Sequence, residues 1–538
     1  MGVKGYPIKH IVIIMVSAMS FFIFAGKNTL DEDNNKSIFT YDFTGKTTAL
    51  PVPTAEKLPS SWKGFNLLNM FYLKGRETDI PFNEKEFKMM SDWGFNFARI
   101  PIDYRILIKS NNWDNMNESA MRRLDKVVEY GIKYDIHICL NLHRAPGYTV
   151  ASPAETANLW TQEKPQEAFA RMWGFIAERY KNVPNEYLSF NFLNEPSGVD
   201  EKTYADVIKK AAHAIRAHDS NRILIADGLD YGNIPSYLIK ELGIAQATRG
   251  YAPHNITHYK ANWIEGSDNF PLPTWPVFLL PKYLYSFYKD DVPRSVFRIE
   301  YDFNMAYSLD VNVGTVSNEA RLIVKADGKI IYDRLFKSGS GKGEWTQAVY
   351  NRRWNIYQNI FNKDYRIDIP AGAKAITLEV TDGDWMSVND LKFSPVCKTA
   401  VSGTAIPFSV TPNIPDWGAV IPSVKVSANG QFITESAHVQ NGEWLKNTYI
   451  KPWDELIKNG GGAMVGEWGS HNRTPHDVVL RWMEDNLLNF KDAGMGWALW
   501  NLTGSFGVLN SGRNDVNYEN YNGYKLDREM LNLLRKYL

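Results

Sequence analysis

Short apolar runs of strand length recur eight times along this chain and alternate with helical patterns. The runs are KGFNLLNM (63–70), FNFARIPI (95–102), HICLNLHR (137–144), YLSFNFLNE (187–195), RILIADG (222–228), TRGYAPHN (248–255), AMVGEWG (463–469) and GWALWNL (496–502). Helical patterns such as 118–135, 165–181 and 201–218 lie between them. Strands that alternate with helices favour a parallel sheet. Eight such units predict an α/β fold, a (β/α)8 TIM barrel, with its active site at the C-terminal ends of the strands.

An open, doubly wound sheet is the alternative arrangement for the same alternation. Sheets of that kind often bind dinucleotides at a Gly-x-Gly-x-x-Gly motif that follows the first strand. The segment after the first run contains no such motif. The sequence therefore favours the closed barrel and predicts no nucleotide cofactor.

The interval between the sixth and seventh runs is too long for a helix and its loops. Roughly 180 residues precede the helical pattern at 442–460, where a helix and short connections would suffice. Much of the interval is strand-like, at 295–303, 320–336 and 375–384, with two Asp-Gly pairs that favour hairpin turns. The expected domains are a first barrel part at 55–289, an inserted all-β sandwich at 290–397 and a second barrel part at 398–538.

The N-terminal segment has the pattern of an export signal. Two lysines precede an uncharged apolar stretch at 11–25, and polar residues follow it. This stretch is shorter than the roughly 20 residues that span a bilayer as a helix. We therefore expect a cleaved signal peptide at 1–26, a linker at 27–54 and a periplasmic or extracellular protein. An uncleaved membrane anchor is the alternative.

Charge and cysteine content exclude several classes of partner. The 60 basic and 60 acidic residues cancel, so the chain lacks the positive charge typical of proteins that bind nucleic acid or anionic membranes. Cys139 and Cys397 are far apart in sequence, and both are expected to be separate thiols. Because no metal-ligand spacing occurs, neither a metal nor another cofactor is expected.

Two glutamates interrupt apolar runs where the predicted strands end. Glu195 closes the run at 187–195, and Glu467 lies in GGAMVGEWG at 461–469. The C-terminal ends of barrel strands meet at one face. A pair of carboxyl groups across a cleft is what a retaining glycosidase uses, one to protonate the leaving oxygen and one to attack the sugar. For either motif alone, a chance occurrence in a loop is the alternative.

The order of several motifs resembles a known enzyme family. ARIP, LNLHRAPGY, FLNEP, VGEWG and WALWNL follow one another as in glycoside hydrolase family 5, the cellulase family of clan A, over about 55–275 and 440–538. THYKANW, GEWLKNTYIKPW, GEWGSHNRTPH and GWALWNLTGSFGVL look like a bacterial subgroup in which a β-sandwich interrupts the barrel. The resemblance implies a (β/α)8 barrel and hydrolysis with retention of anomeric configuration.

Matching positions imply roles for the two acids and one arginine. Glu195 is expected to be the acid/base, because a second carboxylate nearby in a desolvated pocket raises the pKa of a carboxyl group. Glu467 is expected to be the nucleophile, which must stay ionised. Arg99 matches the family arginine that holds the nucleophile, and a guanidinium favours the charged form of a carboxyl group. An arginine bound to a structural acid is the alternative for Arg99.

Three further residues match sugar-contacting positions of the family. Asn194 matches the asparagine that hydrogen-bonds the hydroxyl next to the reacting carbon. His143 matches a histidine of the third strand, with a scaffold histidine as the alternative. Trp500 matches the tryptophan that forms the floor of the first subsite, with core packing as the alternative, although the apolar neighbours of Trp497 make it the better core candidate.

The sixth strand departs from the family pattern. Family members usually carry His-x-Tyr there, with the tyrosine hydroxyl bonded to the nucleophile, and the aligned stretch here is Arg249-Gly250-Tyr251. Tyr251 is expected to keep the tyrosine role, and His258 is expected to face the ligand. Loss of the histidine leaves the substrate open, because that position shapes the site around the sugar.

Aromatic residues suit a carbohydrate ligand but do not specify it. The chain contains 17 Trp, and sugar rings present C–H faces that pack on aromatic rings. The inserted domain looks like a carbohydrate-binding module, in which Trp345, Trp354 and Trp385 form either a sugar platform or ordinary core. Such a fold does not establish binding.

The sequence thus predicts a retaining glycosidase that acts on a neutral polysaccharide or oligosaccharide. Exo action is expected, because the large insertion could close one end of the cleft, and glucosides, xylosides and furanosides all remain open. The first alternative is a catalytically silent glycan-binding protein on the same scaffold. The second is a hydrolase of another class such as an esterase, which the absence of a Gly-x-Ser-x-Gly motif disfavours.

Overall fold

The structure, a computed structural model, consists of two compact units. It describes residues 39, 57–71, 73, 81–287, 294–396, 406–414, 418, 421, 423–427, 432–433 and 439–538. The barrel unit comprises the chain up to Trp275 together with Asn441–Leu538, and the β unit comprises Pro276–Gln440. The expected signal peptide, the expected linker apart from Phe39, and Cys397 lie outside the described residues.

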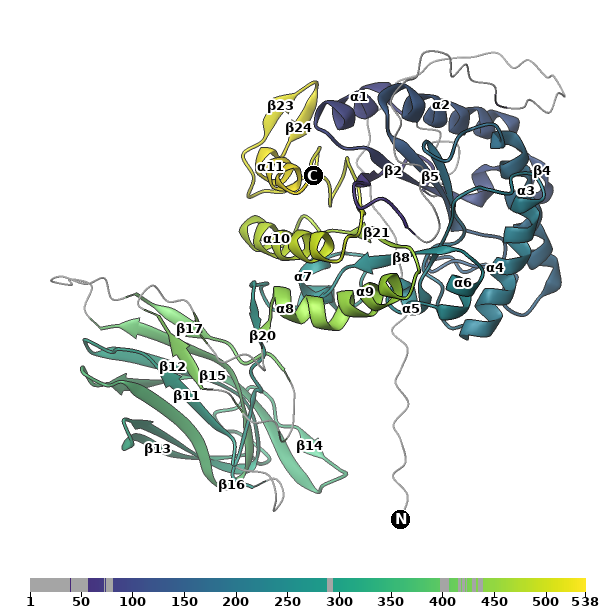
Figure 1. Cartoon of the computed structure of the whole chain (residues 1–538). Coiled ribbons are helices and arrows are strands. Elements are labelled where there is room, and N and C mark those ends of the chain that lie inside the picture. Colours follow the sequence, from purple (N-terminus) through teal and green to yellow (C-terminus); the bar gives the residue numbers. More distant parts are fainter. Residues whose placement is uncertain are drawn as a thin grey trace. The chain divides into compact units, whose positions relative to one another are not determined.

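Eight parallel strands close into a barrel in the barrel unit (Figure 1). Their order follows the sequence: β1 (Lys63–Asn66), β2 (Phe97–Asp103), β5 (His137–Arg144), β6 (Leu188–Asn191), β7 (Leu224–Asp227), β8 (Ala245–Gly250), β21 (Ala463–Trp468) and β22 (Trp497–Leu499). Each of the eight apolar runs supplies one strand. The predicted (β/α)8 fold is therefore confirmed.

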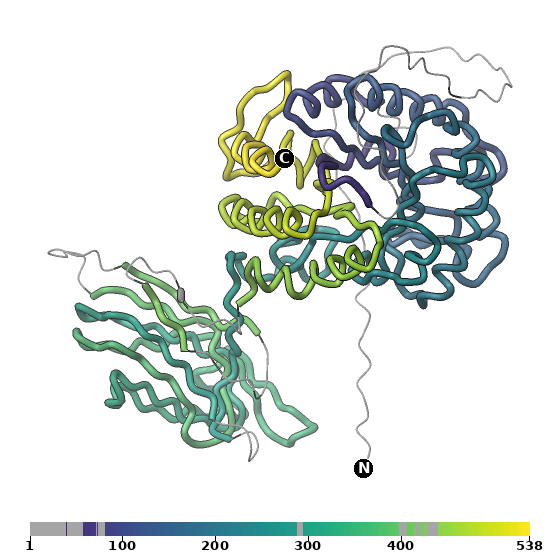
Figure 2. The backbone as a smooth tube through the Cα atoms, viewed as in Figure 1, coloured from purple at the N-terminus to yellow at the C-terminus, as the bar shows by residue number. Residues whose placement is uncertain are grey.

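Helices form a layer outside this ring of strands (Figure 2). They are α1 (Glu84–Asp92), α2 (Glu118–Tyr134), α3 (Glu163–Tyr180), α4 (Glu201–Arg216), α5 (Leu229–Gly232), α6 (Tyr237–Glu241), α7 (His254–Thr257), α8 (Gly442–Leu445), α9 (Lys451–Lys458), α10 (His476–Asp492) and α11 (Arg528–Lys536). A π-helix (Lys446–Ile450) joins α8 to α9, and 3-10 turns occupy Tyr104–Ile106 and Ser267–Asn269. Small hairpins are formed by β3 (Ile108–Lys109) with β4 (Asn112–Met116), and by β23 (Glu519–Tyr521) with β24 (Tyr524–Leu526).

Local sequence signals define the long helices. Asp200 caps α4 by accepting a hydrogen bond from the backbone N–H of Thr203, and a cap of this kind contributes about 1 kcal/mol. In α2, buried Leu124, Val128 and Ile132 recur at a spacing of four residues, which places them on one face of the helix. The amphipathic helix α2 therefore buries this apolar face.

Closure of the barrel depends on a close approach at Gly64. This residue pairs with Phe97 between β1 and β2, and a Cβ atom at Gly64 would lie 1.7 Å from the carbonyl oxygen of Phe97. No side chain fits there. One end of the barrel is filled with apolar side chains, including Phe97, Ile225 and Met464, so polar side chains from the same strands are left for the opposite end.

The β unit is an all-β insertion with its own core. Its strands are β9 (Val277–Phe278), β10 (Tyr283–Tyr285), β11 (Val296–Glu300), β12 (Tyr307–Ala326), β13 (Lys329–Lys337), β14 (Tyr350–Asn351), β15 (Ile356–Ile369), β16 (Ala375–Pro395), β17 (Phe408–Val410), β18 (Val424–Val426), β19 (Phe432–Ile433) and β20 (Val439–Gln440). Ten of them form one sheet, in which the long strands β12 and β16 pair antiparallel and shift register at several bulges. One cluster of buried apolar residues packs between parts of this sheet.

The insertion is longer at both ends than the expected 290–397. The compact β unit runs from Pro276 to Gln440, because β9 and β10 precede the expected start and β17 to β20 follow the expected end. These strands have only two or three residues each. Alternation of apolar and polar residues needs four or more positions to be recognised, so the sequence pattern did not include them.

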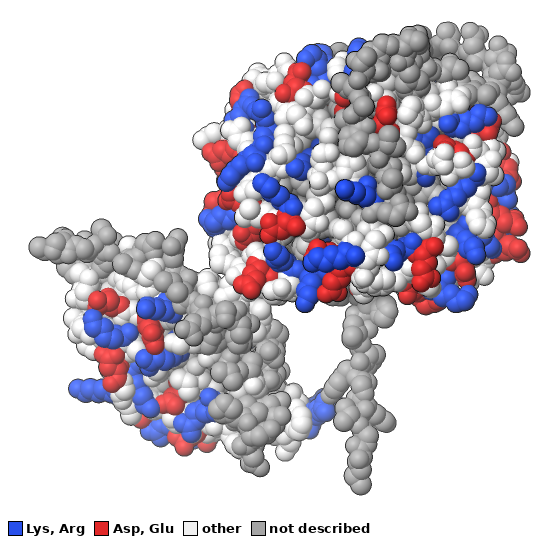
Figure 3. All heavy atoms as spheres, in the orientation of Figure 1, with Lys and Arg blue, Asp and Glu red and all other residues white. Residues whose placement is uncertain are grey.

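Surface charge on the barrel unit is mixed in sign. Figure 3 shows acidic and basic side chains interspersed with uncharged ones over its visible face. Among the helices of the described part of the chain, none has the length and apolar character that crossing a bilayer requires.

Candidate active site

Glu195 lies in the loop that follows β6, and its backbone is held from two sides. Its N–H donates a hydrogen bond to Asp227 Oδ2 (2.9 Å), and its carbonyl oxygen accepts one from the hydroxyl of Tyr148 (2.6 Å). Its φ of +50° lies in the left-handed region, which costs energy for a residue with a side chain and occurs often at active sites. The carboxyl group of Glu195 lines a cavity.

Glu467 is a buried residue of β21 whose two carboxylate oxygens have different partners. Arg99 Nη1 donates to Oε1 (2.6 Å), and the hydroxyl of Tyr251 donates to Oε2 (3.2 Å). Burial and the two nearby glutamates raise the pKa of Tyr251 well above its usual range, so this hydroxyl stays protonated and remains a donor. The structure thus brings Arg99 and Tyr251, both singled out from the sequence, onto Glu467.

The guanidinium of Arg99 is fixed by polar side chains from β1, from β6 and from the loop that follows β6. Its nitrogen atoms donate to side-chain oxygens of Asn66 (3.0 Å), Asn191 (2.9 Å) and Asn194 (3.0 Å). Because the side-chain oxygen of Asn194 is bound in this way, its Nδ2 atom is left without a protein partner among the described residues. That Nδ2 can donate to a ligand.

His143 and Trp500 lie side by side near Glu467. Their rings stack with centroids 5.6 Å apart, and Phe71 packs edge-on against both. His143 Nδ1 is 4.0 Å from Glu467 Oε1, but burial, followed by the charges of Arg99 and other arginines, holds the pKa of His143 well below its usual range. The imidazole is therefore neutral, and neither ring nitrogen has a hydrogen-bond partner among the described residues.

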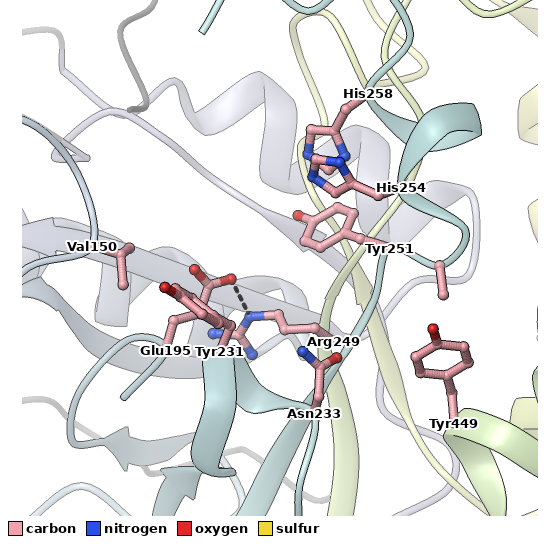
Figure 4. Close-up of a pocket in the computed structure, with 10 residues that line it drawn as sticks. Val150, Glu195, Tyr231, Asn233, Arg249, Tyr251, His254, His258 and Tyr449 are labelled. Atoms are coloured by element: carbon pink, nitrogen blue, oxygen red, sulfur yellow. Dashed lines mark hydrogen bonds and ion pairs between the residues drawn. The ribbon is translucent and has the colours of Figure 1, made fainter. Parts of the chain in front are cut away.

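A cavity of about 200 Å³ opens beside Glu195 (Figure 4). It is lined by Val150, Glu195, Tyr231, Asn233, Arg249, Tyr251, Ala252, His254, His258 and Tyr449. His258, which the sequence predicts to face the ligand, is one of these residues, and it stacks on His254 with ring centroids 4.1 Å apart. Five of these ten residues carry an aromatic or imidazole ring.

Arg249 has a larger part in the site than the sequence indicated. In the sequence it stands out only as the residue that replaces a histidine in the sixth strand. Its Nε donates to Glu195 Oε1 (3.0 Å), and its Nη2 lies 3.2 Å from Glu467 Oε1 and donates to Asn194 Oδ1 (2.8 Å). Both carboxylates therefore contact one guanidinium group, and Figure 4 shows it directed at Glu195.

Asp227 is a site residue that sequence analysis did not find. It is the last residue of β7, it is fully buried, and it forms an ion pair with Arg249 Nη2. The signal was present, because Asp227 closes the apolar run RILIADG just as Glu195 closes its own run.

The pKa of Glu195 is raised to about 7. Burial is the largest cause, because removal of water disfavours the carboxylate. Glu467 and Asp227 raise the pKa further through their negative charges, whereas Arg249 lowers it. A carboxyl group with this pKa can donate and accept a proton near neutral pH. Within the described residues, no group of three or more His, Cys, Asp or Glu side chains is arranged to hold a metal ion.

Comparison with known proteins finds one matching family model and several partly similar enzymes. The family model for Cellulase (glycosyl hydrolase family 5) matches residues 54–263. Endoglucanase C of Acetivibrio thermocellus is 31% identical over 194 residues, which are 35% of this chain and 56% of that protein. Cellodextrinase A of Ruminococcus flavefaciens is 27% identical over 188 residues, 34% of this chain and 54% of that protein. The chain thus spans little more than half the length of these curated relatives.

A solved structure extends the similarity beyond the matched segment. The crystal structure of a glycoside hydrolase aligns with 88% of this chain and 98% of its own, at 26% sequence identity and a TM-score of 0.56. This similarity is distributed over more of the chain than the 194 residues aligned to the endoglucanase.

Proposed function

We propose that this chain is a retaining glycosidase of the cellulase family, glycosyl hydrolase family 5, and that it cleaves O-glycosidic bonds by double displacement. Glu195 is the proposed acid/base and Glu467 the proposed nucleophile. The substrate is proposed to be a neutral polysaccharide or oligosaccharide.

One observation carries this proposal. Two buried carboxyl groups from different strand ends contact the same guanidinium, that of Arg249, at 3.0 Å and 3.2 Å. Their other surroundings differ, because Glu467 also receives hydrogen bonds from Arg99 and Tyr251, while burial raises the pKa of Glu195. Paired acids in unlike environments are the arrangement that divides acid and nucleophile roles.

In the first step, Glu467 attacks the anomeric carbon while Glu195 transfers its proton to the departing oxygen. Arg99 and Tyr251 fix the two oxygens of Glu467, which leaves the carboxylate in one orientation for attack. In the second step, the Glu195 carboxylate removes a proton from water, and the resulting hydroxide oxygen displaces Glu467 from the sugar.

Sugar contacts are proposed for residues with unused hydrogen-bonding atoms. Asn194 Nδ2 and both ring nitrogens of His143 are buried without a protein partner in the described part of the chain, and buried polar atoms of this kind cost energy unless a ligand or water satisfies them. The neutral imidazole of His143 can donate one hydrogen bond and accept another. Trp500, stacked on His143, is proposed as the floor of the first subsite.

Exo action is the finer proposal for the mode of cleavage. The cavity of about 200 Å³ is smaller than the roughly 300–1,000 Å³ typical of pockets for drug-sized ligands, so it suits a short saccharide end. Glucosides are the first candidates, since the similar proteins include an endoglucanase and a cellodextrinase, and xylosides and furanosides are the next. Digestion of oligosaccharides labelled at the reducing end tests this proposal, because internal cleavage products would contradict it.

Hydrolysis of aryl glycosides tests the central proposal. Wild-type protein is expected to release the aglycone from at least one glycoside of a panel, and proton NMR is expected to detect the sugar first with its original anomeric configuration. Glu467→Ala is expected to abolish release. If wild-type protein binds oligosaccharides in calorimetry but cleaves no glycoside, the glycan-binding alternative replaces the enzyme. First formation of the opposite anomer would contradict double displacement.

A further inference from the structure

Arg249 and Asp227 form an ion pair beneath the carboxyl group of Glu195. Arg249 comes from β8 and Asp227 from the end of β7, and both side chains are almost completely buried. The guanidinium of Arg249 contacts Glu195, Asp227, Asn194 and Glu467. A buried charge is costly unless it is paired, so this arrangement needs an explanation.

Two glycines make room for the arginine. A Cβ atom at Gly232 would lie 2.9 Å from Arg249 Cγ, and one at Gly466 would lie 3.1 Å from Arg249 Nη1. Gly232 also has a φ of +81°, which favours glycine. Helix α5, which follows β7, and strand β21 therefore leave a passage through which the long side chain reaches from β8 to the loop after β6.

We propose that Arg249 and Asp227 act as a positioning pair that orients the carboxyl group of Glu195 and sets the pH range in which it can act as an acid. The proposal rests on the proposed function only for the chemical role of Glu195. It concerns two residues to which the proposed function assigns no role, although Arg249 also lines the cavity.

Hydrogen bonding explains the orientation. Asp227 Oδ2 accepts from the backbone N–H of Glu195 and from Arg249, while Asp227 Oδ1 accepts from Asn191 Nδ2 (3.1 Å). One carboxylate thus fixes both the backbone and the side-chain partner of Glu195. Arg249 Nε donates to Oε1 of Glu195, and Oε2 has no hydrogen-bond partner within the described residues. The proton that is transferred is therefore carried on Oε2.

The local charges explain the control of protonation. The charged or titratable groups around Glu195 are Arg249 and Tyr251 from β8 and its end, Asp227 from β7, Glu467 from β21, Arg99 from β2, and Tyr148 from the loop after β5. Two guanidinium groups face three carboxyl groups. One proton on Glu195 makes the cluster neutral, so the resting protein is expected to hold that proton.

The two members of the pair act on Glu195 in opposite directions. Arg249 lowers the pKa of Glu195 and Asp227 raises it. Arg249→Gln is therefore expected to raise the pKa of Glu195, by about 1–3 pH units if it follows the usual effect of an adjacent cation. Asp227→Asn is expected to lower it, because a negative charge is lost and Arg249 is released from its partner.

Carbon-13 NMR of protein labelled at the glutamate side-chain carboxyl carbon measures this pKa directly, with Glu195→Gln used to assign the signal. The alkaline limb of the pH profile of kcat/KM is expected to move with it, upward in Arg249→Gln and downward in Asp227→Asn, on an aryl glycoside with a poor leaving group, because departure of that group requires the proton of Glu195. Arg249→Lys keeps the positive charge and is expected to leave the pKa of Glu195 closer to that of wild-type protein than Arg249→Gln does.

A pKa of Glu195 that shifts in the same direction in Arg249→Gln and Asp227→Asn, or that shifts in neither variant, would overturn the positioning role. If a single variant does not fold, the double variant Arg249→Gln/Asp227→Asn removes the pair together. Because the lowering effect of Arg249 on the pKa of Glu195 is larger than the raising effect of Asp227, a raised pKa in the double variant supports the proposal, and an unchanged or lowered pKa overturns it. The NMR titration needs no turnover. If the pKa of Glu195 shifts in opposite directions in the two single variants while wild-type protein cleaves no glycoside, the positioning role of the pair is supported and the proposed function is rejected.

Discussion

The barrel unit and the β unit bury different kinds of side chain. At one end of the barrel, three carboxyl groups and two guanidinium groups are buried together (Glu195, Asp227, Glu467, Arg99 and Arg249). In the described part of the β unit, the core cluster is apolar and no charged side chain is buried. Since buried charges destabilise a fold unless they are paired, their concentration in one place indicates chemistry. The apolar interior of the β unit contributes only to stability.

The strongest test of this contrast is removal of the nucleophile. Glu467→Ala is expected to lower kcat on aryl glycosides by a factor on the order of 10⁵, because no other group can form the covalent intermediate. Glu167→Ala, at an exposed position on α3, is the matched control and is expected to keep full activity. Stopped assays on both purified variants measure the difference. Comparable activity in the two variants would contradict the assignment of catalysis to the buried charged groups of the barrel.

A core substitution in the β unit is expected to affect stability without affecting catalysis. Leu322→Ala on β12 removes a fully buried side chain and is expected to lower the free energy of unfolding by about 2–5 kcal/mol. Leu335→Ala on β13, an exposed leucine, is the control and is expected to change it little. Calorimetry measures the unfolding, and kcat/KM is measured below the transition. A large loss of kcat/KM in folded Leu322→Ala protein would show that the two units are not independent.

Much of the barrel and its two acids could be predicted because they produce local patterns. Apolar runs gave all eight strands, and a carboxylate at the end of such a run drew attention to Glu195 and Glu467. The role of Arg249 could not be predicted in this way. It depends on a long side chain that crosses between strands through space left by two glycines. Because these glycines are distant from Arg249 in sequence, no local sequence pattern could reveal the arrangement. Asp227 had the same local signal as the acids, but no motif accompanied it.

Protonation of Glu195 makes stability depend on pH in the opposite sense to most carboxyl groups. The folded-state pKa of about 7 lies above the unfolded value of about 4.3, so the folded protein binds the proton more tightly. The resulting stability is fully present below the unfolded pKa and is lost as pH rises through 7. Glu195→Gln lacks this loss. Relative to wild-type protein, the variant is expected to gain about 3 kcal/mol between pH 4 and pH 8.

Denaturant unfolding at several pH values measures this gain. The control is Glu167→Gln, whose exposed side chain should leave the pH dependence of stability as in wild-type protein. A difference between Glu195→Gln and wild-type protein that stays constant from pH 4 to pH 8 would mean that Glu195 is already ionised in the folded protein. In that case the buried cluster of the barrel would be charged rather than neutral.

The smallest effect is expected at the surface of the β unit. The structure separates two of its tryptophans, because Trp345 packs against the core cluster whereas Trp354 is 62% exposed beside β14. Trp354→Ala is expected to change the free energy of unfolding by less than about 0.5 kcal/mol, and Trp345→Ala to lower it by about 1–3 kcal/mol, since a packed ring is lost. Electrophoresis in gels containing polysaccharide measures glycan binding as retention of the protein, independently of the unfolding measurement. Weaker retention of Trp354→Ala alone would assign glycan contact to this exposed ring, because its fold is intact, and would give the β unit a function at its surface that its core lacks.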